Sequence, residues 1–235
     1  GRHVGPRRLY LWLWVTKSMV IAIDGPAAAG KGTLAGRLAA SLGLAHLDTG
    51  LLYRATAARL MRGKSNAISE QAATAAARSL SADDLGGSQL RGEKLAGLAS
   101  LIATHDSVRS ALIDFQRDFA ASPPGGAKGA VLDGRDIGSV ILPDADIKIF
   151  VTASAEARAE RRYQELRGRG VHSIRSVVLR EMQERDERDR RREVAPMVPA
   201  KDAFLLDTTN MDADAAFEAA YEFVILRHIE NGRSE

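Results

Sequence analysis

Cysteine is absent from the 235-residue sequence, which excludes a disulfide framework and thiolate chemistry. The histidines are few and show no metal-ligand spacing, so we interpret all five as ordinary surface or boundary residues: His3, His46, His105, His172 and His228. No metal site is assigned directly to protein side chains on this basis. The lack of cysteine is compatible with the cytoplasm, which is the location we expect.

A long hydrophobic run is also absent from the N-terminal region. The apolar run at residues 9–15 has seven residues, whereas a helix needs about 20 to span a bilayer. No small-residue cleavage site follows it, which argues against a secretory signal. We therefore expect residues 1–18 to be an extension outside the fold and the protein to bind no membrane. Attachment through Trp12 and Trp14 is the alternative.

The net charge is only +3, which is too small to indicate a nucleic-acid-binding protein. Charge is nevertheless uneven, because residues 158–192 contain twelve Arg, no Lys and seven acidic residues. Arg suits bidentate contacts with phosphate or carboxylate. In the charged run ERDERDRRRE (residues 184–193), helical spacing places four side chains on one face: Arg185, Arg188, Asp189 and Arg192. Such a face is either solvent-exposed surface or a binding surface for a polyanion.

Apolar runs alternate with helical patterns along the chain, which is typical of an α/β fold. The predicted strands are residues 19–23, 44–47, 130–132, 147–151 and 204–206. The predicted helices are residues 31–41, 51–61, 155–166, 176–192 and 213–229. Residues 67–121 are predicted to be helical throughout, with a break near residues 83–87, and residues 122–129 to form a loop. Residues 19–235 are expected to form a single domain.

The stretch IAIDGPAAAGKGTL (residues 21–34) follows a predicted strand and opens a predicted helix, as a phosphate-binding loop requires. Its glycines let the backbone curl so that successive N–H groups point at an anion, and the helix N-terminus adds its positive dipole end. Lys31 would reach the β- and γ-phosphates. The predicted triphosphate site comprises Gly25, Pro26, Ala27, Ala28, Ala29, Gly30, Lys31, Gly32 and Thr33, with Thr33 as a candidate Mg²⁺ ligand.

The residues after Lys31 narrow the class of protein. Gly32 stands between Lys31 and Thr33, a variant found in nucleoside-monophosphate kinases such as adenylate kinases. A GTPase would need an Asn-Lys-x-Asp base reader, which the sequence lacks. Helicases and motor ATPases usually carry an acidic strand-end motif, which the chain does not clearly show.

Three further stretches are expected to face the phosphate loop. They are HLDTGLLYR (residues 46–54), VLDGRDIG (131–138) and ERDERDRRREVAPMVPA (184–200). The first two follow predicted strands, and the carboxyl ends of parallel strands line one crevice where ligands bind. Taken singly, Asp48 could be a helix cap, and Asp133 and Asp136 could be turn residues.

With these motifs in this order, residues 19 to about 229 closely resemble the bacterial cytidylate kinase family. The resemblance implies a P-loop kinase fold, with a five-stranded parallel sheet flanked by helices. It also implies a mobile acceptor-binding subdomain (about 48–121) and an Arg-rich lid (about 158–195). The implied reaction is phosphoryl transfer from ATP to CMP or dCMP, giving ADP and CDP or dCDP, with Mg²⁺.

The resemblance also implies roles for individual residues. Cytosine would be read by Ser100, Arg109 and Asp136, and the acceptor phosphate held by Arg54 and Arg135 with Tyr53 beside them. The sugar would contact Arg185 and Asp189, and the CMP site also includes Asp48 and Thr49. The lid arginines Arg188 and Arg192 would join Lys31 and Arg135 as catalytic residues.

The chain departs from longer family members, which carry a small antiparallel sheet in the acceptor-binding subdomain. Residues 81–91 are too few for that sheet, and the surrounding sequence has a helical pattern. Two alternatives stay open: a kinase for UMP, AMP or another small acceptor, and a non-catalytic RNA-binding or regulatory P-loop protein. We expect a monomer that binds ATP and CMP or dCMP but no nucleic acid.

Overall fold

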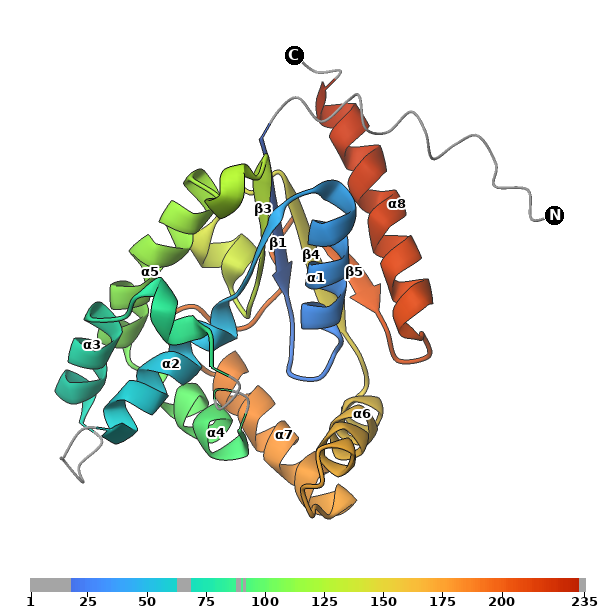
Figure 1. Cartoon of the computed structure of the whole chain (residues 1–235). Coiled ribbons are helices and arrows are strands. Elements are labelled where there is room, and N and C mark those ends of the chain that lie inside the picture. The colour runs from blue at the N-terminus through green and yellow to red at the C-terminus, as the bar shows by residue number, and fades with distance from the viewer. Residues whose placement is uncertain (1–17, 63–68, 88–89, 91, 233–235) are drawn as a thin grey trace.

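One sheet of five parallel strands runs through the middle of the molecule, in the order β2-β3-β1-β4-β5 (Figure 1). The strands are β1 Met19–Asp24, β2 Ala45–Asp48, β3 Gly129–Asp133, β4 Ile147–Thr152 and β5 Phe204–Asp207. Parallel neighbours need crossover connections, which explains the alternation of strands and helices along the chain. The expected five-stranded parallel sheet is confirmed, and each predicted strand is found within one or two residues of its predicted ends.

The computed structural model describes residues 18–62, 69–87, 90 and 92–232. The expected N-terminal extension, residues 1–18, lies outside the described residues except for Ser18. Within the described ranges, no helix combines the length and the apolar character needed to cross a membrane.

Helices cover both faces of the sheet and bury its apolar side chains. On one face, α1 (Lys31–Leu42) and α8 (Ala213–Gly232) pack together and bury Leu38 and Val224 against the strands. On the other face, α5 (Asp106–Ala121) contributes Leu112 to a second cluster. The inner strands β1 and β3 are covered on both faces and are nearly continuous apolar runs, whereas burial alternates along β4 and the edge strands β2 and β5 are partly exposed.

A helical subdomain follows β2. It consists of α2 (Thr49–Arg62), α3 (Glu70–Arg78), the short 3₁₀ helix η3 (Ala82–Leu85) and α4 (Glu93–Ile102). The described residues between positions 49 and 128 contain no strand, in line with the expected loss of the small antiparallel sheet.

The expectation that residues 67–121 are helical except for a break near residues 83–87 is wrong at one further point. The chain also breaks between α4 and α5, where His105 has an extended backbone with φ −85° and ψ 120°. Asp106 then supplies an acidic first turn to α5, which suits the positive end of its helix dipole.

The region expected to be a lid forms a helical hairpin of α6 (Ala155–Gly168) and α7 (Arg175–Arg190). Leu166 and Met182 are among the apolar residues packed between the two helices. Helix α7 ends two residues earlier than predicted, and the Arg192 guanidinium turns back to the Asp189 carboxylate. Two single turns complete the fold: the 3₁₀ turn η5 (Pro124–Gly126) and the π-helical turn η6 (Ile137–Ile141).

Because β1 and β3 approach each other closely at Gly129, this position has no room for a side chain. A Cβ atom there would lie 2.0 Å from the carbonyl oxygen of Met19. We expect Gly129→Ala to lower the free energy of unfolding by at least about 2 kcal/mol, because the strands must separate. Gly97→Ala is the control: a Cβ there meets nothing within 4 Å. In helix α4 it should stabilise by about 0.5–1 kcal/mol. Equal stabilities of the two variants in chemical denaturation would contradict this packing.

Candidate active site

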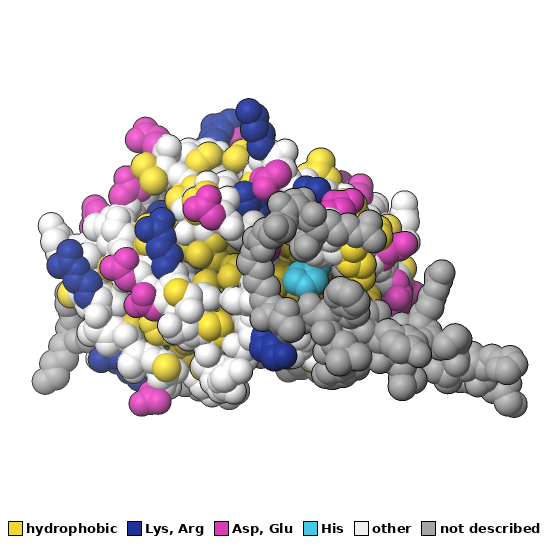
Figure 2. Space-filling model, turned by 90° about the horizontal axis from the view of Figure 1, so that it is seen from above, with side chains coloured by type: hydrophobic (Ala, Val, Ile, Leu, Met, Phe, Trp, Pro, Cys, Tyr) yellow, Lys and Arg dark blue, Asp and Glu magenta, His cyan; other side chains and the backbone are white. Residues whose placement is uncertain are grey.

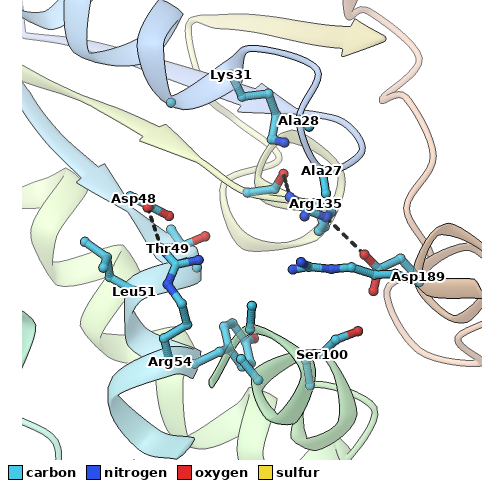
Figure 3. Close-up of a pocket in the computed structure, with 18 of the residues that line it drawn as sticks. Ala27, Ala28, Lys31, Asp48, Thr49, Leu51, Arg54, Ser100, Arg135 and Asp189 are labelled. Carbon is cyan, nitrogen blue, oxygen red and sulfur yellow. Dashed lines mark hydrogen bonds and ion pairs between the residues drawn. The ribbon is translucent and has the colours of Figure 1, made fainter. Parts of the chain in front are cut away.

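A cavity of about 1000 Å³ opens where the strands end, between the sheet, the helical subdomain and the α6–α7 hairpin. The loops after β1, β2 and β3 reach it, together with α4, α5 and α7. Side chains from these separate elements point toward one common space in Figure 3.

Most of the predicted site residues line this cavity. Those that do are Ala27, Ala28, Lys31, Gly32, Thr33, Asp48, Thr49, Tyr53, Arg54, Ser100, Arg109, Arg135, Asp136, Arg185, Arg188, Asp189 and Arg192. The other four predicted residues, Gly25, Pro26, Ala29 and Gly30, belong to the loop after β1 but do not line the cavity. The three motifs that follow the phosphate loop in sequence therefore meet it in space.

The loop between β1 and α1 has the backbone of an anion cradle. Gly25 has φ 138° and Gly30 has φ 96°, and a Cβ at Gly25 would lie 1.9 Å from the carbonyl oxygen of Val151. Only glycine fits that position. A third residue, Ala28, is also left-handed with φ 57°, although it carries a side chain. Helix α1 begins with no side-chain cap and no acidic residue in its first turn, so its N-terminal N–H groups face no competing carboxylate there.

Lys31 lies buried at the base of the cavity, and its Nζ donates to the carbonyl oxygen of Pro26 at 2.7 Å. Burial and, after it, the nearby charge of Arg135 lower the pKa of Lys31 to about 7, against the opposing effect of Asp133. A buried amine beside other cations favours an incoming anion, because the anion would restore its charge.

The cavity carries more positive than negative side chains. Ten Lys or Arg residues line it, against seven Asp or Glu residues. Three carboxylates hold four of these cations: Asp48 accepts from Arg54 (2.7 Å), Asp136 accepts from Arg109, and Asp189 accepts from both Arg135 (3.1 Å) and Arg192. Burial and the charge of Arg135 lower the pKa of Arg185 to about 10. In contrast, the end of the molecule seen in Figure 2 mixes both signs of charge.

Several buried polar atoms at the cavity have no hydrogen-bond partner. Among the described residues these include Ser100 Oγ and the Nε atoms of Arg54, Arg185 and Arg192. Buried polar atoms in proteins are nearly always satisfied, by protein groups, water or a ligand. All four residues line the same cavity, which therefore has the donors and acceptors to recognise a polar anionic ligand.

Comparison with known proteins agrees with this geometry. The cytidylate kinase family model matches residues 21–225. The chain belongs to the cytidylate kinase family. It is 59% identical over 203 residues to the cytidylate kinase of Paramagnetospirillum magneticum, covering 86% of this chain and 96% of the relative. It is 56% identical over 210 residues to that of Methylocella silvestris, covering 89% and 95%.

Two features at or beside this cavity were not predicted from the sequence. Asp133 ends β3, lines the cavity and contacts His46 Nε2 at 2.7 Å, so an acidic strand-end residue is present after all. His46 is exposed, as the surface or boundary interpretation expected, and it also lines the cavity, which the sequence did not predict. The position of Asp133 after an apolar strand was a usable signal, whereas its pairing with His46 joins residues 87 positions apart.

The second feature is the contact of Asp24 with the turn η6. The buried Asp24 carboxylate accepts from the backbone N–H groups of Ile137 and Gly138, both at 2.7 Å. Burial raises the pKa of Asp24 to about 6 despite these hydrogen bonds. The contacts join β1 to the turn η6 and thereby fix the segment that carries Arg135 and Asp136.

The charged run at residues 184–193 is partly surface and partly site. Asp186 and Asp189 are buried, at 4% and 1% exposure, whereas Glu187 and Arg190 are exposed. The four residues expected on one face all line the cavity. The run is therefore exposed surface at some residues and cavity lining at others, and binding of a polyanion by the lining residues stays a prediction.

The burial of Lys31 leads to a test on the free protein. The pKa of Lys31 is about 7 when folded and 10.5 at its ordinary value. The unfolded chain therefore binds a proton that the folded one does not, and stability is lost as pH falls from about 10.5 to 7. We expect Lys31→Met to raise the melting temperature most at pH 7 and below, by a stabilisation on the order of a few kcal/mol.

The control for this test is Lys94→Met, because Lys94 lines the same cavity but is exposed. It should leave the melting temperature nearly unchanged at every pH. A lower melting temperature for Lys31→Met than for the parent protein at pH 7 would contradict the argument.

Proposed function

We infer that this chain transfers the γ-phosphoryl group of ATP to CMP or dCMP, giving ADP and CDP or dCDP. One observation carries the inference: a phosphate loop and an arginine-rich acceptor region share one cavity. The curated relatives matching nearly the whole chain are cytidylate kinases. These matches do not favour a UMP or AMP kinase, or a non-catalytic RNA-binding protein.

The donor phosphates belong at the loop between β1 and α1. Its inward N–H groups and the uncapped start of α1 suit the polyphosphate chain. Lys31 would leave the carbonyl oxygen of Pro26 and contact the β- and γ-phosphates. Its charge counts most as negative charge develops on the transferred group.

The oxygen ligands at the loop fit Mg²⁺ carried with ATP. Thr33 and Asp133 line the cavity, and the described part of the chain has no cluster of three or more His, Cys, Asp or Glu that could hold an ion alone. Mg²⁺ commonly binds through one or two protein oxygens and the substrate phosphates. We propose that Thr33 and Asp133 hold it. The bound ion would neutralise charge on the phosphates.

The acceptor phosphate lies between the donor and the helical subdomain in this proposal. Arg54 would hold it, oriented by the 2.7 Å contact with Asp48, and Arg135 would hold it from the turn after β3. Thr49 has a structural contact nearby, where its hydroxyl donates to the carbonyl oxygen of Asp133 at 2.8 Å. Tyr53 lies beside Arg54 in α2 and lines the same cavity.

Phosphoryl transfer at this site needs no general base. An oxygen of the CMP phosphate is already ionised at neutral pH and attacks the γ-phosphorus of ATP. The bond from that phosphorus to the β–γ bridging oxygen breaks, and ADP leaves. The protein must hold two repelling phosphates in line and stabilise the charge that develops, which is the work of Lys31 and the arginines.

Cytosine recognition is assigned to Ser100, Arg109 and Asp136, which come from α4, α5 and the turn after β3. The Asp136 carboxylate, held by Arg109, can accept from the exocyclic amino group of cytosine. Burial raises the pKa of Asp136, and the charge of Arg109 opposes that rise. The buried Ser100 hydroxyl has no partner among the described residues, which leaves it available to the base.

The sugar and the lid complete the proposed site. Asp189 already accepts from Arg135 and Arg192, and its remaining lone pairs can accept from a ribose hydroxyl. Arg185 would contact the sugar, and Arg188 and Arg192 would close over the phosphates. Lid closure of this kind expels water from the transfer reaction.

A monomeric state, a cytoplasmic location and the absence of nucleic-acid binding stay predictions from the sequence.

Base identity can be tested apart from phosphate chemistry. We expect Asp136→Asn to lower kcat/KM for CMP far more than for UMP, because uracil presents a carbonyl where cytosine presents an amino group. One lost charge-assisted hydrogen bond should lower the CMP/UMP ratio of kcat/KM roughly tenfold to a hundredfold. The measurement is steady-state ADP release with each nucleotide.

Asp48→Asn is the matched control, since Asp48 orients Arg54 and both nucleotides present the same phosphate. It should lower both efficiencies together and leave the ratio unchanged. If a folded Asp136→Asn variant keeps the parent ratio, Asp136 does not read the base.

A further inference from the structure

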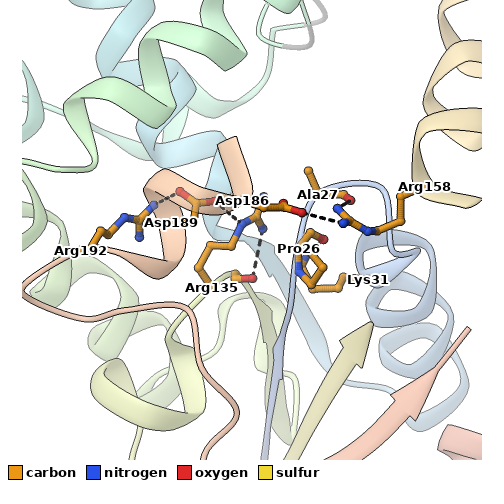
Figure 4. A network of polar contacts seen from close by, with 9 residues as sticks. Pro26, Ala27, Lys31, Arg135, Arg158, Asp186, Asp189 and Arg192 are labelled. Atoms are coloured by element: carbon orange, nitrogen blue, oxygen red, sulfur yellow. Dashed lines mark hydrogen bonds and ion pairs between the residues drawn. The ribbon is translucent and has the colours of Figure 1, made fainter. Parts of the chain in front are cut away.

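Arg158 is a buried arginine outside the residues assigned so far. It lies in the first turn of α6, is 3% exposed and does not line the cavity. Its guanidinium donates to three acceptors from different parts of the fold: the Ala153 carbonyl after β4 (3.0 Å), the Ala27 carbonyl in the phosphate loop (3.2 Å) and Asp186 in α7 (2.6 Å). Figure 4 shows Arg158 extending from α6 toward Ala27 of the loop and Asp186 of α7.

The contact with the Ala27 carbonyl sets the direction of an N–H group. That carbonyl belongs to the peptide between Ala27 and Ala28, and in a trans peptide the N–H of Ala28 points the opposite way. Ala28 has φ 57°, a conformation that a residue with a Cβ keeps only when its surroundings hold it. Arg158 is a charged donor that holds the carbonyl side of this peptide.

The neighbouring loop carbonyls are held by different groups. The Ala29 carbonyl accepts from Thr208 Oγ1 at 3.0 Å, and that hydroxyl accepts from Arg161 Nη1 at 3.1 Å. The Pro26 carbonyl accepts from Lys31, which leaves it in the proposed reaction. Two residues of helix α6 therefore support the loop, Arg158 directly and Arg161 through Thr208. Arg158 is the one of the two that also contacts α7.

The partner of Arg158 has features of a positioning contact. Asp186 is 4% exposed, and its second carboxylate oxygen is buried with no hydrogen-bond partner among the described residues. A buried ion pair with an unsatisfied oxygen adds little stability compared with apolar residues of similar volume. The ion pair of Arg158 and Asp186 is therefore better explained by the orientation that it gives to the groups around it than by a contribution to stability.

We propose that Arg158 is a positioning residue: it holds the Ala28 N–H toward the donor phosphates, and through Asp186 it couples that orientation to lid helix α7. The proposal rests on the proposed function, which places ATP phosphates at this loop. It assigns a role in donor binding to a side chain that touches neither substrate. CMP binding should not depend on it, because the three acceptors of Arg158 lie outside the proposed CMP site.

The test replaces both charges at once, so that neither is left buried alone: Arg158→Met with Asp186→Leu. We expect a melting temperature close to that of the parent protein and calorimetric affinity for CMP unchanged. Affinity for a non-hydrolysable ATP analogue should fall on the order of 10- to 100-fold. Arg158→Lys is a second variant, which keeps a charge for Asp186 but has all its donors on one nitrogen and lacks the planar fork that reaches three separate acceptors. It should lose affinity for the analogue in the same direction.

The matched control is a second ion pair between α6 and α7. Arg175 contacts Glu160 at 2.7 Å on the exposed side of the hairpin, and neither residue lines the cavity. Arg175→Gln with Glu160→Gln should leave affinity for the ATP analogue unchanged.

Three results would overturn the proposal. The first is an affinity for the ATP analogue that equals that of the parent protein, in the folded double variant or in Arg158→Lys. The second is a loss of CMP affinity in the double variant as large as its loss of ATP-analogue affinity. The third is a loss of ATP-analogue affinity in the Arg175 and Glu160 control variant as large as that in the double variant. Failure of the proposed function has a different signature, because the parent protein itself would then not bind the ATP analogue or phosphorylate CMP.

Discussion

Positive charge can be concentrated inside a folded protein only where something holds the cations in place, and here buried carboxylates do so. Asp136 and Asp189 hold three arginines between them, and each carboxylate is nearly inaccessible to solvent. These carboxylates hold the guanidinium groups in place without cancelling the net positive charge of the cavity. Ten basic and seven acidic side chains line that cavity. The arginines can therefore face a phosphate from fixed directions at little reorganisation cost.

The parallel sheet determines where this charge is assembled. All five strands end at the same edge, so the segments after β1, β2 and β3 meet there although they are far apart in the chain. Asp24 strengthens the arrangement by holding the backbone of Ile137 and Gly138 from the end of β1. Burial of Lys31 in this setting costs stability in the free protein and leaves at the base of the cavity an amine whose charge a bound phosphate would restore. Stability is given up locally for function, as is common at active sites.

Features that depend on local pattern could be predicted from the sequence alone. Apolar runs indicated the strands, and the spacing of the glycines and Lys31 indicated the phosphate loop. Prediction failed where a side chain has a distant partner: His46 with Asp133, Asp24 with the turn after Asp136, and Arg158 with the Ala27 carbonyl. The left-handed Ala28 was missed for a related reason, because alanine carries no signal for that conformation and only tertiary contacts hold it.

In the proposed function, one cavity holds both phosphate chains in line. A bisubstrate compound in which adenosine and cytidine are joined through five phosphates tests this arrangement, with its affinity measured by calorimetry against those of ATP and CMP alone. The compound should bind at least about 100-fold more tightly than either nucleotide, and excess ATP and excess CMP should each displace it. Binding no tighter than that of ATP, or displacement by ATP alone, would contradict the claim.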